Sequence, residues 1–260
     1  SRHCISSAAS DVYKRQGQLV GSAAVDGFVV YSVAAGDAYL EAVRRRGLPV
    51  VVCDQPTDSG LPFVGIDDRA AIAPAARALI ESSHTRIGIL TIRLHRERLD
   101  GFVSPEQLAA ADMHVQRSRV LGALDVFQDA GLSPESIPVV TRHINDSRTA
   151  YAAAEELLTE HPELTAVLCT TDSMALGVLA YARDHGIAVP SQLSVTGFDG
   201  IAPALAVDLS TVVQPNKAKG AAAGHMLADL ISRPSTPPQE PPRKVLSTTF
   251  HAGRTVAPPA

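Results

Sequence analysis

The sequence predicts an α/β fold in which helices cover both faces of a mostly parallel sheet. Short apolar runs rich in β-branched residues alternate with alanine-rich stretches of helical period, and glycines end several of those stretches. The apolar runs are hydrophobic on both faces, as strands buried in a parallel sheet are. Right-handed crossovers then give a doubly wound sheet, whose ligand crevice lies beyond the carboxyl ends of the strands.

The predicted elements follow one another along the chain. Each strand is a short apolar run closed by polar residues or glycine, and each helix is a longer stretch with a period near 3.6 residues. Strands are predicted at 25–32, 48–54, 61–67, 86–91, 137–144, 165–172, 193–200 and 244–251. Helices are predicted at 37–47, 69–83, 115–130, 147–159, 173–185 and 217–231. The stretch 92–113 is charged and irregular, and the proline-rich stretch 233–243 is predicted to be a surface linker.

Composition excludes several classes of protein. The chain has 260 residues, 45% of them hydrophobic, which is enough to bury a core. It has no run of about 18 apolar residues that could span a membrane, and its first residues lack the apolar centre of a secretory signal. Its three cysteines, Cys4, Cys53 and Cys169, are odd in number and far apart, which fits a reducing cytoplasm. Acids and bases are interspersed at a net charge of −4, so we do not expect the chain by itself to bind DNA.

The sequence also lacks the common catalytic motifs. It contains no GxxxxGK[ST] loop, no GxGxxG that opens a helix, no GxSxG elbow and no HExxH pair. Its nine histidines are scattered without metal-ligand spacing, and we interpret His84 and His143 as structural. We therefore predict a protein that is not an enzyme and that uses neither a cofactor nor a metal ion.

Polar residues at the strand ends are the candidate binding groups. Asp199 lies between an aromatic ring and a glycine, and this suits a polyol because the acid accepts from hydroxyls while the ring covers C–H surface. Thr171 can donate to a ligand hydroxyl, and Asp172 beside it is alternatively a helix N-cap or a loop brace. Arg119 offers fixed donors to hydroxyls or a phosphate, although its periodicity alone favours a solvated helical arginine. Asp199, taken alone, is equally well explained as a turn residue.

The order of these motifs resembles the effector domain of LacI/GalR transcriptional regulators. The stretch TAVLCTTDSMALGVLAYARDHGIAVPSQLSVTGFDG, followed by LSTVVQP, is similar to the second half of that family's pattern. VDGFVVYS, LPVVVCDQP and VGIDDRAAIAPAARALIESSHTRIGIL are similar to the first half. SRVLGALDVFQDAG resembles the family's R-x-x-G helix, and GRTVAPP resembles its closing segment. The resemblance covers roughly residues 17–258.

This resemblance implies two Rossmann-like subdomains of the periplasmic-binding-protein type, with the ligand between them. The first would hold residues 17–84 plus 215–242, and the second would hold 85–214 plus 243–260. It further implies a cytoplasmic homodimer without catalytic activity, in which a sugar or related polyol alters the operator affinity of an attached helix-turn-helix headpiece. The residues carried over by position are Arg119, Thr171 and Asp199 as a polar clamp, with Phe198, Gln214, Asn216, Tyr31 and Ser32 lining the site. Thr171 stands where many relatives have Asn, which shortens its reach.

The beginning of the chain departs from the family pattern. The headpiece, the hinge helix and the first strand and helix of the core would precede VDGFVVYS, and residues 1–16 fit none of them. We therefore expect an N-terminally truncated core with an incomplete first subdomain and a non-native or disordered leader, which is poorly stable and binds its effector weakly. The alternative is a periplasmic sugar-binding protein that serves an ABC-type transporter, against which VPSQLSVTGFDG and LSTVVQP favour a regulator.

Overall fold

The computed structural model describes residues 20, 22–232 and 240–260. Its contacts divide the chain into two units. One runs up to Gly65 and includes Asn216–Leu246, and the other holds Ile66–Pro215 and Ser247–Ala260. The predicted leader at residues 1–16 lies outside the described residues, as does most of the predicted linker.

The first unit contains a four-stranded sheet with the order β1-β2-β3-β10. Its strands are β1 (Phe28–Tyr31), β2 (Val50–Cys53), β3 (Phe63–Ile66) and β10 (Arg243–Leu246), and its helices include α2 (Ala38–Arg44) and α10 (Asn216–Ser232). Every residue of β2 is buried, because its two faces contact different helices. Val50 and Val52 belong to an apolar cluster with side chains of α2, whereas Val51 packs with side chains of α10.

The second unit contains a seven-stranded sheet with the order β11-β9-β8-β7-β4-β6-β5. The five inner strands run parallel, and β5 and β11 are antiparallel to their neighbours. The strands are β4 (Ile87–Ile92), β5 (Gly101–Phe102), β6 (Val139–Arg142), β7 (Ala166–Cys169), β8 (Ser194–Asp199), β9 (Ser210–Val213) and β11 (Thr249–His251). The inner strands are almost wholly buried, as their apolar runs predict.

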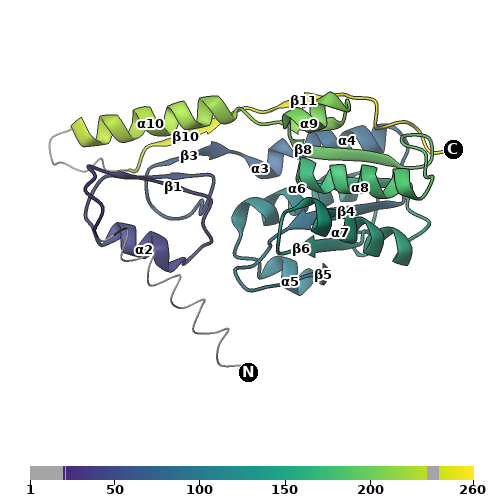
Figure 1. Ribbon diagram of the computed structural model, residues 1–260, viewed down its shortest axis with the longest axis horizontal. Coiled ribbons are helices and arrows are strands. Elements are labelled where there is room, and N and C mark those ends of the chain that lie inside the picture. The colour runs from purple at the N-terminus through teal and green to yellow at the C-terminus, as the bar shows by residue number, and fades with distance from the viewer. Residues whose placement is uncertain (1–19, 21, 233–239) are drawn as a thin grey trace, which may run out of the picture. The chain divides into compact units, whose positions relative to one another are not determined.

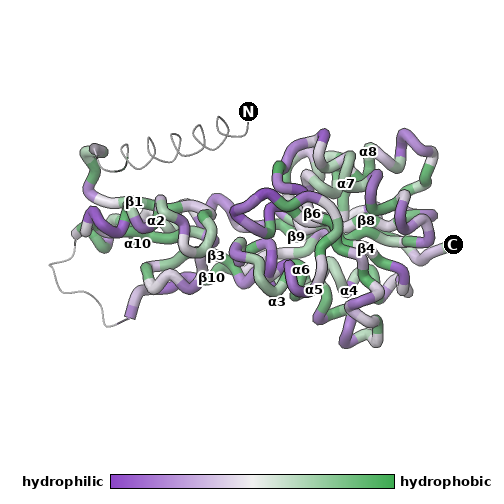
Figure 2. Tube along the Cα trace, turned by 90° about the horizontal axis from the view of Figure 1, so that it is seen from below, coloured by the Kyte–Doolittle hydropathy of each residue, from purple (hydrophilic) through white to green (hydrophobic). Residues whose placement is uncertain are grey.

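Helices pack on both faces of this larger sheet (Figures 1 and 2). α7 (Ser147–Glu160) and α8 (Asp172–Asp184) share an apolar cluster with Val140, Val167 and Val195 of the strands. On the opposite side, α4 (Ala73–Glu81) and α6 (His114–Asp129) contact β8, β9 and β4. The shorter helices are α3 (Asp68–Ala71), α5 (Pro105–Ala109), α9 (Ala202–Ala206) and the 3-10 turn η1 (Pro134–Ser136). The predicted α/β fold with helices on both faces of parallel sheets is confirmed.

Neither α9 nor β9 is among the predicted elements, and the helix predicted at 69–83 is divided into α3 and α4. Three further details differ from the sequence expectation. Residues 66–84, expected in the first subdomain, group with the second unit because α3 and α4 pack against α6. The single strand expected at 244–251 is two strands in different sheets, because β10 pairs beside β3 and β11 beside β9. The irregular stretch 92–113 contains β5 and α5, whose two and five residues are too short for a periodic signal.

Candidate functional site

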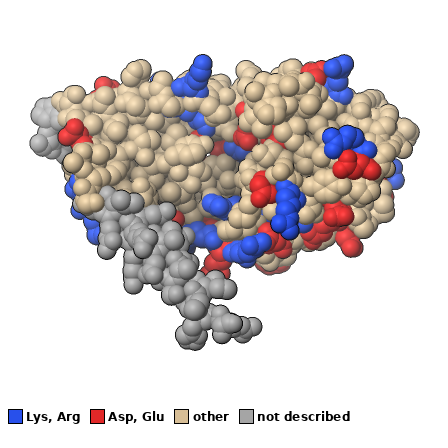
Figure 3. Space-filling model, in the orientation of Figure 1, with Lys and Arg blue, Asp and Glu red and all other residues tan. Residues whose placement is uncertain are grey.

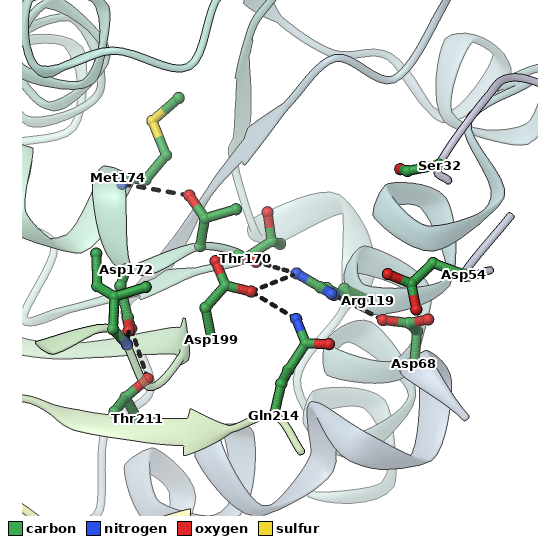
Figure 4. Close-up of polar contacts among 12 residues, drawn as sticks. Ser32, Asp54, Asp68, Arg119, Thr170, Asp172, Met174, Asp199, Thr211 and Gln214 are labelled. Atoms are coloured by element: carbon green, nitrogen blue, oxygen red, sulfur yellow. Dashed lines mark hydrogen bonds and ion pairs between the residues drawn. The ribbon is translucent and has the colours of Figure 1, made fainter. Parts of the chain in front are cut away.

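Arg119 of α6 is the centre of a buried polar cluster in the second unit (Figure 4). It is only 6% exposed. Its Nε donates to Oδ1 of Asp68 at 2.8 Å, and its Nη1 donates to the carbonyl oxygen of Thr170 at 2.9 Å. The same Nη1 lies 3.5 Å from Oδ1 of Asp199. The interpretation of Arg119 as a solvated helical residue is therefore wrong, since a guanidinium at this depth is held by fixed acceptors.

The end of β8 supplies an aromatic ring and a carboxylate to this cluster. The guanidinium carbon of Arg119 lies 3.7 Å from the centroid of the Phe198 ring, which is a cation–π arrangement. Phe198 is fully buried, so it supports Arg119 and does not present a surface that lines an open site, contrary to the expectation for it. The side chain of Asp199 is 25% exposed, and its Oδ1 accepts from Nε2 of Gln214 at 2.7 Å. Gln214 follows β9, so two neighbouring strand ends bring these groups together.

Asp68 is the member of the cluster that the sequence analysis missed. It is the first residue of α3, its side chain is 5% exposed, and it accepts from Arg119 across the two helices. Its neighbour Asp67 is the last residue of the strand predicted at 61–67, and in the structure it caps α3 by accepting from the backbone N–H of Ala70. The doublet Asp67–Asp68 after a buried strand was the available signal, because one acid can cap the helix while the next accepts from a neighbouring helix.

Thr171 does not contact Arg119 through its side chain. It is 4% exposed and its Oγ1 accepts from the backbone N–H of Met174 at 3.3 Å, which makes it the N-cap of α8. Its neighbour Thr170 supplies the carbonyl group that Arg119 contacts. Asp172 is the first residue of the helix and not its cap, and its carboxylate accepts from Thr211 and from the backbone of Ile201. Of the two structural interpretations of Asp172, the loop brace is therefore the one that the contacts support.

Three of the predicted site residues belong to the first unit. Tyr31 ends β1 and is 66% exposed, and Asn216 begins α10. Both line a cavity of about 360 Å³ in that unit. Ser32 follows β1 with φ 52° and its hydroxyl accepts from Nε2 of Gln55 at 3.0 Å. The structure thus brings Tyr31 and Asn216 together, and Ser32 follows Tyr31 in the chain.

A buried ion pair lies beside these residues in the first unit. Nζ of Lys219, on α10, donates to Oδ1 of Asp54 at 2.9 Å, and both residues are buried. Lys219 and Cys53 also line the cavity. Burial, with a smaller contribution from Asp54, raises the pKa of the Cys53 thiol to about 11, so this cysteine stays protonated at neutral pH and is a poor nucleophile.

The Arg119 cluster offers both donors and acceptors of hydrogen bonds. Its carboxylates accept hydrogen bonds, its guanidinium donates them, and the Gln214 amide does both, as neighbouring hydroxyls of a polyol require. In the part of the chain that the structure describes, no three His, Cys, Asp or Glu side chains are arranged to hold a metal ion. None of the described helices is both long enough and apolar enough to cross a membrane.

Comparison with known proteins identifies the fold of this site. A family model described as a periplasmic binding protein-like domain matches residues 76–256. The transcriptional regulator IpsA of Corynebacterium glutamicum is 51% identical over 242 residues, which are 93% of this chain and 66% of that protein. The regulator Rv3575c of Mycobacterium tuberculosis is 44% identical over 241 residues, which are 92% of this chain and 65% of that protein. The chain therefore spans slightly less than two thirds of the length of these relatives.

Solved structures agree with these relatives. A LacI-family transcriptional regulator from Corynebacterium glutamicum superposes with a TM-score of 0.88 at 50% identity, over 94% of this chain and 72% of that one. The regulator CelR in complex with cellobiose superposes with a TM-score of 0.79 at 25% identity, over 94% of this chain and 69% of that one. The chain belongs to the periplasmic binding protein-like domain family, in the form found in LacI-family transcriptional regulators.

Proposed function

We propose that this chain is the effector-sensing domain of a LacI-type transcriptional regulator, and that a sugar or related polyol binds at the Arg119 cluster. The observation that carries the proposal is a buried guanidinium held between the carboxylates of Asp68 and Asp199. The side-chain amide of Gln214 donates to the Asp199 carboxylate, so the cluster can exchange hydrogen bonds with several hydroxyls. The likeness to the complex of CelR with cellobiose supports a sugar-like ligand.

The likeness to transcriptional regulators also supports a proposal for the compartment and the assembly of this domain. We infer a cytoplasmic homodimer without catalytic activity, in which the bound ligand changes the operator affinity of a helix-turn-helix headpiece. The alternative, a periplasmic sugar-binding protein that serves a transporter, is not favoured, because the relatives named above regulate transcription.

Thermal unfolding with a panel of neutral sugars and cyclic polyols, cellobiose among them, tests this proposal. Concentrations should reach about 10 mM, because weak binding is expected and stabilisation requires ligand well above its Kd. At least one compound should raise the unfolding midpoint of the chain in proportion to the logarithm of its concentration. Asp199→Asn should abolish that shift, because the amide replaces an acceptor oxygen by a donor.

Asp129→Asn is the matched control, since it neutralises an exposed carboxylate on the helix that carries Arg119. It should leave the ligand-induced shift unchanged. Equal stabilisation of both variants would place the ligand elsewhere, and turnover of any sugar in the panel would contradict a binding domain without catalysis.

A further inference from the structure

The turn that follows β8 holds Asp199 in a backbone conformation that a chain rarely adopts. Asp199 has a φ of 125° and Gly200 has a φ of 71°. A residue with a side chain persists at such a φ only where its surroundings fix it. The carboxylate of Asp199 can meet Arg119 and Gln214 only while this turn keeps its shape. The turn therefore needs a support of its own.

The carboxylate of Asp172 supplies that support. Asp172 is completely buried, and its Oδ2 accepts from the backbone N–H of Ile201 at 2.8 Å. Gly197 lies against the same carboxylate. Gly197 and Ile201 lie two residues before and two residues after Asp199, so one carboxylate contacts the chain on both sides of that residue.

A further contact attaches this turn to the neighbouring strand. Oδ1 of Asp172 accepts from the hydroxyl of Thr211, on β9, at 2.5 Å (Figure 4). The space for the carboxylate depends on Gly197, because a Cβ at that position would lie 2.3 Å from Oδ1 of Asp172. The cap of α8 is Thr171, so Asp172 is not required for capping its own helix. Its contacts point instead toward β8, the following turn and β9.

We propose that Asp172 is a positioning residue for ligand binding, which fixes the turn after β8 so that the carboxylate of Asp199 meets Arg119 and Gln214. The part of this inference that concerns ligand rests on the proposed function, whereas the fixing of the turn is measurable without ligand. A carboxylate is needed because two donors, the backbone N–H of Ile201 and the hydroxyl of Thr211, approach its two different oxygens. An asparagine amide has one acceptor oxygen and two N–H donors, so it would leave one of these buried donors unsatisfied.

Two variant pairs test the positioning in the full chain without ligand. In Asp172→Asn, hydrogen exchange at the backbone amide of Ile201 should be about tenfold faster, and the side-chain amide resonances of Gln214 should shift. Asp146→Asn removes a capping carboxylate from α7 and should change neither. If Asp172→Asn does not fold, Thr211→Val provides the same test, because valine keeps the shape of threonine and lacks the hydroxyl. Thr211→Ser keeps the hydroxyl and should exchange as the wild type does.

Isothermal titration calorimetry with cellobiose separates the claim about the turn from the claim about ligand binding. Thr211→Val should bind it about tenfold more weakly than the wild type, and Thr211→Ser should bind as the wild type does. Unchanged exchange in Asp172→Asn and Thr211→Val would overturn the positioning role. Faster exchange with unchanged affinity would overturn its importance for ligand binding. If the wild type binds no compound of the polyol panel, the proposed function is refuted. If exchange is nevertheless faster in Asp172→Asn and Thr211→Val, the role of Asp172 in fixing the turn still holds.

Discussion

Two arginine–aspartate pairs join α3 to α6, and they differ in burial. The side chains of Arg119 and Asp68 are 7% and 5% exposed, whereas those of Arg69 and Asp125 are 56% and 47% exposed. Asp68→Asn leaves a buried guanidinium without one of its anions, so we expect it to lower the free energy of unfolding by about 3 kcal/mol. Asp125→Asn breaks a pair that water already screens, and the expected loss is at most about 1 kcal/mol. Urea denaturation of both variants measures the difference, and equal losses would contradict it.

His84 should make the stability of the second unit depend on pH. It is 1% exposed, and its ring nitrogens lie 2.9 Å from Oγ1 of Thr165 and from the carbonyl oxygen of Ala257. Burial lowers its pKa below the ordinary value of 6.5, against a smaller opposing effect of the bond to Ala257. The unfolded chain therefore binds the proton more readily, so this stability is complete above the unfolded pKa and falls as the pH drops through it.

The urea midpoint should accordingly be lower at about pH 5.5 than at about pH 7.5. His84→Gln removes the titrating group, and the difference between the two midpoints should shrink. If the variant keeps the full difference, other groups cause the acid sensitivity of the chain.

Some residues of the candidate site could be predicted from the sequence, and others could not. Asp199 was found because it ends a strand, where ligands of parallel sheets bind, and the family likeness singled out Arg119 and Gln214. Asp68 was missed because only the packing of α3 on α6 brings it to Arg119. The side-chain contacts of Thr171 likewise depend on the turn that makes it a helix cap, which its position beside Asp172 did not reveal.

Among the elements, α3 and α6 approach each other closely at a glycine. A Cβ on Gly122 would lie 2.2 Å from the carbonyl oxygen of Arg69. Alanine is the better helix former, but here it would force α3 away from α6, so we expect Gly122→Ala to lower the free energy of unfolding by about 1–3 kcal/mol. Because α3 also carries Asp68, any polyol found to bind should bind more weakly.

Gly220→Ala is the matched control for this prediction. Gly220 lies within α10, and a Cβ there would meet nothing within 4 Å. The same substitution should therefore be neutral or should stabilise by up to about 1 kcal/mol. Thermal unfolding of both variants is the measurement, and a stabilised Gly122→Ala would show that α3 moves without cost.

Burial on both faces accounts for some of the predicted strands but not for all, since β9 is also buried and is not among them. The runs that contain β2 and β7 are apolar on both faces, and all residues of both strands are buried, so these strands were predicted with only their ends too long. The two residues of β5 have no period to detect. The change of sheet between β10 and β11 depends on pairing with β3 and β9, which local sequence does not encode.

For the whole molecule, charge distribution matters more than any single pair. The chain has a net charge of −4, and on the face that Figure 3 shows, basic and acidic side chains are interspersed. Affinity for DNA that does not depend on base reading comes from lysine and arginine side chains that neutralise successive phosphates and release counterions. Interspersed carboxylates oppose that attraction, so we expect this chain by itself to have little affinity for DNA.

The chain alone should therefore leave a labelled DNA duplex unbound at about 10 µM protein in about 150 mM salt, a range in which many basic proteins bind without specificity. Fluorescence anisotropy of the duplex is the measurement.

Fusion of a helix-turn-helix headpiece before the chain should produce DNA binding. The logarithm of the binding constant should fall linearly with the logarithm of the salt concentration, because the headpiece then supplies the phosphate contacts. That slope gives the number of released counterions, which should match the number of phosphates that the headpiece contacts. It should not change when exposed arginines of this domain, such as Arg98, are replaced by Gln. Salt-dependent binding by the chain alone would instead mean that its own arginines and lysines act together on DNA.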